Sequence, residues 1–329
     1  MHVYRWDLDK TYLQTDFDSV RGLLRAAREP ASAKRNVPGS AALLRALSED
    51  DTARVVILSG SPTQMRETLA AKLKLDGVRY HELHLKDNLG NLRRGRLRAI
   101  RGQFGYKLPR LLKGRQGLGQ AVGETLFGDD AEVDALVYSV FADVIAGRVG
   151  IRELGRIMEA AGSYSDQIDE ACAAAEDIGR AEAVRHIFIH LDRRMPPSRF
   201  RPLGGRVVPI YSWFQAALVL HATGQISAPG LVEVARQVIA ATAWPSALPN
   251  HFQDIVRRGH LRLSDAERLV VDLASLSGDD PEIADMVAVC RERVALLGGT
   301  ARYLPPEPPE RVDYVRLLKH FGRKASKKD

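Results

Sequence analysis

Cysteine and long apolar runs are both scarce in this chain, and each scarcity narrows what the protein can be. Only two cysteines occur in 329 residues, and Cys172 and Cys290 lie far apart with no C-x-x-C pair. This spacing argues against a disulfide framework and against a cysteine ligand cluster, and it predicts a reducing, cytoplasmic setting. No apolar run is long enough to span a bilayer, and the first residues lack the basic-then-apolar pattern of a signal peptide. We therefore expect a cytoplasmic protein with no transmembrane segment, for which only peripheral membrane contact is open.

Acidic residues are nearly missing from one stretch. Between residues 86 and 115, ten lysines and arginines stand against Asp87 alone, and the whole chain has a formal net charge of +7. This balance favours anionic partners but does not choose among phosphate esters, nucleic acids and anionic lipid headgroups. The stretch is either a solvated face or a ribbon that offers cations to a ligand.

Strand and helix patterns alternate in the first half of the chain, which predicts an α/β fold with a parallel sheet. The β-branched run at residues 54–58 is typical of a strand buried on both faces. A proline in the last predicted strand indicates an edge position. From residue 211 to about 297 the pattern is helical. The predicted strands cover residues 2–8, 54–58, 78–85, 124–127, 184–191 and 207–210.

Two carboxylates, Asp7 and Asp9, stand two residues apart at the end of the first predicted strand. Carboxylates so close repel one another, and each raises the other's pKa unless a cation lies between them. Mg²⁺, a hard cation that takes oxygen ligands, relieves this repulsion. The pair therefore predicts a metal site, a catalytic acid/base pair, or both.

Other polar groups follow the ends of other predicted strands. Ser59 follows the second strand, and Asp129 and Asp130 follow the fourth. Lys107 lies near the start of the helix before the fourth strand. Ligands of an open parallel sheet bind beyond the carboxyl ends of its strands, so we expect these groups to meet there.

This ordered set resembles the haloacid dehalogenase superfamily of aspartate-nucleophile phosphatases. D-L-D-K-T at residues 7–11 is similar to the first motif of the family, Ser59 to the second, Lys107 to the third, and G-D-D-A-E-V-D at residues 128–134 to the fourth. The resemblance implies a Rossmann-like parallel sheet with helices on both faces. It also implies a phosphoric monoester hydrolase with Mg²⁺ as cofactor.

A closer resemblance, over residues 2–192, is to the catalytic domain of the actin-patch-type phosphatidate phosphatases. It implies a phosphorylated substrate that is bulky or a lipid, such as phosphatidate. The matching segments are residues 58–62, 84–87, 106–107 and 128–129, with Asp134 and Tyr138.

The resemblance also implies a role for each motif residue. Asp7 would attack phosphorus and form an aspartyl phosphate, and Asp9 would be the acid/base. The residues expected to bind the substrate phosphate, or to hydrogen-bond beside the nucleophile, are Thr11, Ser59 and Lys107. Those expected to hold Mg²⁺ are Asp7, Asp9 through its backbone carbonyl, and Asp129, supported by Asp130 or Asp134.

Three assignments stay open from the residues themselves. Ser61 is an alternative to Ser59, and Lys113 is an alternative to Lys107. Which of the adjacent residues Asp129 and Asp130 is the direct metal ligand is also open.

The resemblance divides the chain into three parts. Residues 1–200 are the expected catalytic domain, with a helical insertion at about 148–183 before the last core strand. Residues 205–300 are an expected all-α extension. Residues 301–329 are an expected proline-rich linker with a basic tail.

The superfamily often inserts a cap domain, but here the gaps have space only for a flap near residues 16–36 and the arginine-rich ribbon at 86–103. An open site is therefore expected, suited to a bulky phosphate ester. A nucleic-acid-end or nucleotide phosphatase and a non-catalytic binding protein on the same fold are the alternatives. The arginines permit nucleic acid as a partner, whereas the intact acids, Ser59 and Lys107 favour the phosphatase.

Overall fold

Six parallel strands form the centre of the molecule. The strand order is β3-β2-β1-β4-β5-β6, and every neighbouring pair is parallel. The predicted α/β class with a parallel sheet is confirmed, as is the edge position of the last strand. The computed structural model describes residues 1–15, 29–88, 90, 102–241, 246–278 and 280–322. The strands are β1 (His2–Trp6), β2 (Ala53–Pro62), β3 (Glu82–Lys86), β4 (Gly123–Asp129), β5 (Val184–His190) and β6 (Val207–Ile210).

The order of the strands reverses at β1. The chain first builds β2 and β3 on one side of β1, and then returns to build β4, β5 and β6 on the other side. Parallel sheets open a crevice beyond the strand ends at such a reversal. Asp7 directly follows β1, so the acid pair lies at this crevice.

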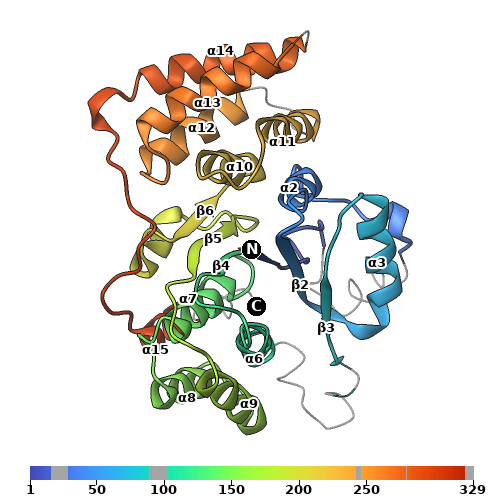
Figure 1. The fold of residues 1–329 in the computed structure, drawn as a ribbon, viewed down its shortest axis with the longest axis vertical. Coiled ribbons are helices and arrows are strands. Elements are labelled where there is room, and N and C mark those ends of the chain that lie inside the picture. The colour runs from blue at the N-terminus through green and yellow to red at the C-terminus, as the bar shows by residue number, and fades with distance from the viewer. Residues whose placement is uncertain (16–28, 89, 91–101, 242–245, 279, 323–329) are drawn as a thin grey trace, which may run out of the picture.

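Helices cover both faces of the sheet (Figure 1). Successive strand residues point to opposite faces, so Leu126 and its neighbour Phe127 belong to two different hydrophobic clusters. The cluster of Leu126 includes α6 (Phe104–Lys113), α7 (Asp134–Ile145), α8 (Ile151–Ala160) and α9 (Ser165–Glu176). The cluster of Phe127 includes α2 (Ser40–Leu47), α3 (Arg66–Leu75) and the helices between β6 and residue 297.

The helices after β6 continue the core of the sheet. One hydrophobic cluster runs from Trp6 in β1 through Leu44 in α2 to Trp213, Phe252 and Val287. The helical extension therefore packs on the face of the sheet and on α2. Its helices are α10 (Trp213–Ala222), α11 (Ala228–Ala241), α12 (Ala247–Arg257), α13 (Leu263–Leu276) and α14 (Pro281–Ala295).

The proline-rich segment after α14 runs back along the molecule to α15 (Tyr314–Gly322) (Figure 1). The backbone amide of Leu304 donates to the carbonyl of Gly259, and that of Gly205 donates to the carbonyl of Glu307. These bonds hold the segment against the fold. Residues 323–329 of the predicted basic tail, 16–28 of the predicted flap, and 89 and 91–101 of the predicted arginine-rich ribbon lie outside the described residues.

The boundaries of β2 and β3 differ most from the prediction. β2 continues past Leu58 to Pro62, and its pairing with β3 shifts register between Ser59 and Pro62. Such an irregularity re-aims side chains next to a site. β3 begins at Glu82 rather than at residue 78, because the amide of Val78 donates to the carbonyl of Leu73 and closes the end of α3.

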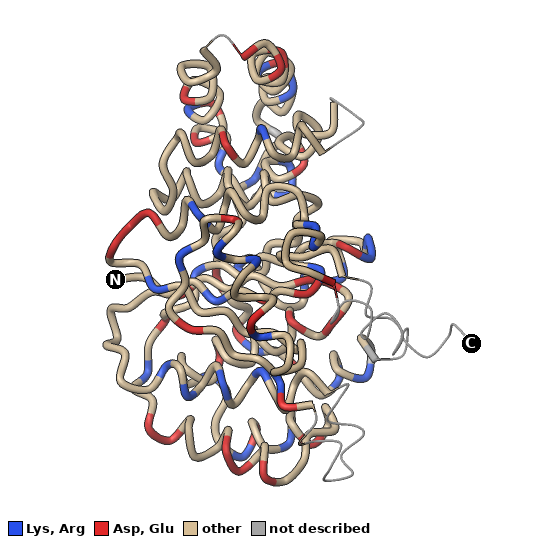
Figure 2. Tube along the Cα trace, turned by 90° about the vertical axis from the view of Figure 1, so that its right-hand side faces the viewer, with Lys and Arg blue, Asp and Glu red and all other residues tan. Residues whose placement is uncertain are grey.

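Charges are interspersed over the described fold. Figure 2 shows lysine and arginine positions interspersed with aspartate and glutamate positions over the described trace. Within the described part of the chain, no helix combines the length and the apolar character needed to cross a bilayer.

Candidate functional site

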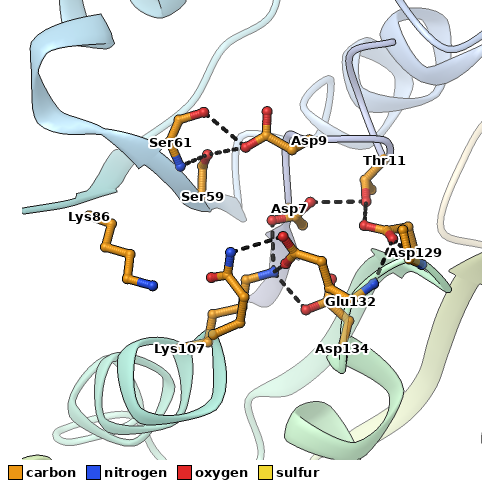
Figure 3. A network of polar contacts seen from close by, with 12 residues as sticks. Asp7, Asp9, Thr11, Ser59, Ser61, Lys86, Lys107, Asp129, Glu132 and Asp134 are labelled. Atoms are coloured by element: carbon orange, nitrogen blue, oxygen red, sulfur yellow. Dashed lines mark hydrogen bonds and ion pairs between the residues drawn. The ribbon is translucent and has the colours of Figure 1, made fainter. Parts of the chain in front are cut away.

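The carboxyl ends of three adjacent strands bring the predicted polar residues together (Figure 3). Asp7 and Asp9 follow β1, Ser59 and Ser61 lie in the last part of β2, and Asp129 ends β4. All five side chains are buried. These five side chains therefore lie together at one edge of the sheet, as expected.

The segment after β1 is a tight loop that turns the acids back toward the sheet. Lys10 has a positive φ of 60°, an uncommon conformation for a residue other than glycine. The carbonyl of Leu8 accepts hydrogen bonds from the amides of both Tyr12 and Leu13, at 2.9 and 2.8 Å. Such strained backbone tends to gather at functional sites. We call residues 7–13 the acid loop.

Lys107 lies at the centre of the carboxylates. Its Nζ atom contacts Asp7 Oδ1 at 2.8 Å, Asp134 Oδ1 at 2.6 Å and Glu132 Oε2 at 3.1 Å. Burial opposes the charge of this ammonium group, but the surrounding carboxylates raise its pKa well above the usual value. Lys113, the alternative from sequence, pairs instead with Glu170 on the surface.

Asp9 is held by both candidate serines. The hydroxyls of Ser59 and Ser61 donate to the same oxygen, Oδ2, at 3.0 and 2.9 Å. The other oxygen, Oδ1, has no hydrogen-bond partner among the described residues. Burial raises the pKa of Asp9 to about 6, and the two serine hydroxyls oppose that rise because they stabilise the ionised form.

Thr11 links Asp7 to Asp129. Its hydroxyl donates to Asp7 Oδ2 at 3.1 Å and lies 3.5 Å from Asp129 Oδ2. The other oxygen of Asp129 accepts the backbone amides of Ala131 and Glu132. Asp129 is thereby fixed beside the nucleophile candidate.

Asp130 points away from this group. Its carboxylate accepts the backbone amides of Arg193 and Met195, at 2.7 and 2.9 Å, and so fastens the loop after β5. Asp130 was a predicted metal ligand, but its carboxylate lies with the loop after β5 and not with the other acids. Adjacent residues at the end of a strand point to opposite sides, which accounts for the difference between Asp129 and Asp130.

The site carries more acid than base. Five carboxylates lie close together near Lys107, and Lys86 extends toward them from one side (Figure 3); the five are Asp7, Asp9, Asp129, Glu132 and Asp134. Burial raises the pKa of both Asp7 and Asp129 well above the usual range, and Lys107 only partly offsets this. Asp134 Oδ2 is buried and, like Asp9 Oδ1, lacks a hydrogen-bond partner within the described part of the chain.

This excess of charge fits a bound cation. The ligand atoms of Asp7, Glu132 and Asp134 lie within 4.8 Å of one another and could hold a metal ion. Lys107 already contacts one oxygen of each of these three carboxylates. Among the described residues, Oδ2 of Asp134 has no hydrogen-bond partner, so this oxygen is available to a metal ion.

Glu132 and Lys86 lie in segments that the sequence singles out, but neither residue had a predicted role. Glu132 lies in the acidic motif itself, but its contact with Lys107 depends on the loop between β4 and α7. Lys86 is the last residue of β3, and the rule that placed the other groups at strand ends also applies to it.

Comparisons with protein-family models, with curated proteins and with solved structures found no match to this chain. The functional argument therefore depends on the geometry of the site.

Proposed function

We propose that this protein is a Mg²⁺-dependent phosphatase of the haloacid dehalogenase type that hydrolyses a phosphate monoester through an aspartyl phosphate on Asp7. One observation carries the proposal: the Asp7 carboxylate faces Lys107 at 2.8 Å, and Asp9, two residues on, is held by two serine hydroxyls. Nucleophile, cation and acid/base thus converge at the reversal point of a parallel sheet.

In the first step a carboxylate oxygen of Asp7 bonds to phosphorus, and the bond from phosphorus to the ester oxygen breaks. Asp9 gives its proton to that departing oxygen, so the alcohol leaves neutral. Lys107 offsets the charge of the phosphoryl oxygens, and Ser59 would turn its hydroxyl from Asp9 to donate to one of them, while Ser61 keeps its bond to Asp9.

In the second step a water molecule attacks phosphorus, and the bond between phosphorus and Asp7 breaks. Asp9 accepts the water's proton, inorganic phosphate leaves, and both aspartates return to their starting states. The pKa of about 6 at Asp9 suits this double role, because an acid/base works best when its pKa is near the working pH.

The donor set fits Mg²⁺, which prefers oxygen ligands. Asp7, Glu132 and Asp134 would hold it, and Asp129, which Thr11 links to Asp7, is a further carboxylate beside them. When bound, the ion supplies positive charge that keeps Asp7 ionised and offsets the charge of the phosphate. Support comes from the buried Oδ2 of Asp134, which has no hydrogen-bond partner in the described part of the chain, and from the raised pKa values of Asp7 and Asp129.

Phosphate release from an aryl phosphate, with and without Mg²⁺, tests the proposal. Asp7→Asn should lower the rate more than about a thousandfold, as loss of a nucleophile does in other enzymes. Asp130→Asn is the matched control, because the same change falls on a carboxylate that holds a loop. It should keep most of the activity. No release by the unchanged protein, or equal release by Asp7→Asn, would overturn the proposal.

A further inference from the structure

Lys86 is a buried lysine that the proposed chemistry does not use. It is the last residue of β3, and only 1% of its surface is exposed. Figure 3 shows its side chain extending toward the site from the side opposite Asp129.

The surroundings of Lys86 form a second polar corner of the site. Its Nζ atom donates to the carbonyl of Gly102 at 2.8 Å and lies 5.6 Å from the centre of the Tyr106 ring. The Tyr106 hydroxyl is buried without a hydrogen-bond partner among the described residues, as is Oε1 of Gln103. Gln103 lies against Gly60 of β2 and bonds to Glu132, so this corner is continuous with the carboxylates.

The position of the corner sets what it can reach. Neighbouring strands lie about 5 Å apart, so the end of β3 is about 10 Å from the end of β1, where Asp7 stands. Lys86 therefore lies to one side of Asp7, while Lys107 already contacts the Asp7 carboxylate directly. Burial and the nearby Lys107 lower the pKa of Lys86 to about 8, so most of it is still charged at pH 7.

We propose that Lys86, with the Tyr106 hydroxyl, binds a second anionic group on the leaving part of the substrate. The inference rests on the proposed phosphatase function and narrows its substrate class. The preferred substrates are phosphate monoesters that carry a carboxylate or a second phosphate a few bonds from the scissile ester. A cation and a hydroxyl donor in a buried corner form strong, charge-assisted hydrogen bonds with such a group.

The test compares phenyl phosphate with carboxyphenyl phosphate. The unchanged protein should prefer the carboxylated ester. Lys86→Met keeps the length of the side chain and removes the charge. It should lower kcat/KM for carboxyphenyl phosphate by about tenfold or more, the usual effect of losing one charge-assisted hydrogen bond. Its kcat/KM for phenyl phosphate should stay within about threefold of the original.

Two further variants separate a binding role from a structural one. Tyr106→Phe removes only the hydroxyl and should cause a smaller loss confined to the carboxylated ester. Lys113→Met is the matched control, since Lys113 lies on the surface with Glu170, and it should change neither rate. Equal losses on both esters in Lys86→Met, or no preference in the unchanged protein, would overturn the inference.

If no ester is hydrolysed, the proposed phosphatase function fails, but binding at Lys86 can still be measured by calorimetry. Inorganic phosphate and 2-phosphoglycolate are titrated into the unchanged protein and into Lys86→Met, both with Mg²⁺. Weaker binding of 2-phosphoglycolate alone in Lys86→Met supports the second anion site. Equal binding of 2-phosphoglycolate by both proteins, or an equal loss for both ligands, rejects it.

Discussion

The indole nitrogen of Trp213 donates a hydrogen bond to the backbone carbonyl of Thr11 at 3.0 Å. This bond joins the first residue of α10 to the acid loop, across 202 positions of sequence. The Trp213 ring also stacks on His190, whose Nδ1 atom lies 3.1 Å from the carbonyl of Lys10. The helical extension thus supports the loop that carries Asp7 and Asp9.

Trp213→Phe should weaken this support. The change leaves the buried Thr11 carbonyl without its donor, which costs about 1–3 kcal/mol of unfolding free energy. It should also lower phosphate release by roughly tenfold, because small displacements of catalytic groups are expensive. Urea unfolding and steady-state assays measure the two effects.

Phe214→Leu is the control for Trp213→Phe, since Phe214 is buried on the same helix and packs edge-on against Phe252. It should reduce stability without reducing the activity of the folded protein. Full activity in Trp213→Phe would show that the bond to Thr11 does not position the acid loop.

Gly128→Ala should displace Asp134. A Cβ atom at residue 128 would lie 2.5 Å from Asp134 Oδ2 and 2.8 Å from the Tyr138 ring, closer than such atoms approach. We expect a loss of about 1–3 kcal/mol in stability and weaker Mg²⁺ activation. Gly119→Ala, where nothing lies within 4 Å, should change neither quantity. An unaltered Mg²⁺ dependence in Gly128→Ala would argue against Asp134 as a ligand.

Asp9→Asn should stabilise the metal-free protein in a pH-dependent way. The pKa of Asp9 rises from 3.8 to about 6 on folding, so the folded state disfavours its charge. Above pH 6 the asparagine variant should gain on the order of 1–3 kcal/mol, and this gain should fade between pH 6 and 4. Urea unfolding in EDTA at pH 8 and pH 4 measures the difference. If Asp9→Asn lowers the unfolding free energy by the same amount at both pH values, folding does not raise the pKa of Asp9.

Ser59→Ala and Ser61→Ala should each move the pH profile. Each hydroxyl lowers the pKa of Asp9, so removing either one raises that pKa further. Asp9 must be protonated to assist the leaving group, so the alkaline limb of kcat should shift to higher pH. A shift in one variant alone would identify the serine that matters. An unshifted alkaline limb in both variants would show that this limb does not report the ionisation of Asp9.

Much of the fold was predictable because its signals are local. The β-branched run before Ser59 and the alternation of strand and helix patterns predicted the parallel sheet correctly. The α12 helix was not separated from its neighbours, because apolar periodicity alone does not show where one helix ends and another begins. The register shift in β2 was also out of reach, since it depends on pairing with β3.

The site was predictable only where strand ends determine position. Asp7, Asp9, Ser59 and Asp129 follow strands that meet at one edge, so their convergence could be expected. Strand alternation predicts that Asp129 and Asp130 point to opposite sides, but which of the two enters the site depends on the amides of Arg193 and Met195. Both amides belong to a loop 63 and 65 residues further along the chain, and no local sequence pattern predicts where that loop lies.

Trapping the phosphorylated enzyme tests the central claim most directly. Asp9→Asn is mixed with nitrophenyl phosphate and Mg²⁺, quenched in acid, digested and analysed by mass spectrometry. Nitrophenolate leaves without an acid, but hydrolysis of the aspartyl phosphate needs Asp9, so the intermediate should accumulate. We predict one phosphoryl group on the peptide containing Asp7, and none in the Asp7→Asn, Asp9→Asn double variant. A label on another residue, or an unlabelled Asp7 in a protein that hydrolyses the ester, would contradict the account.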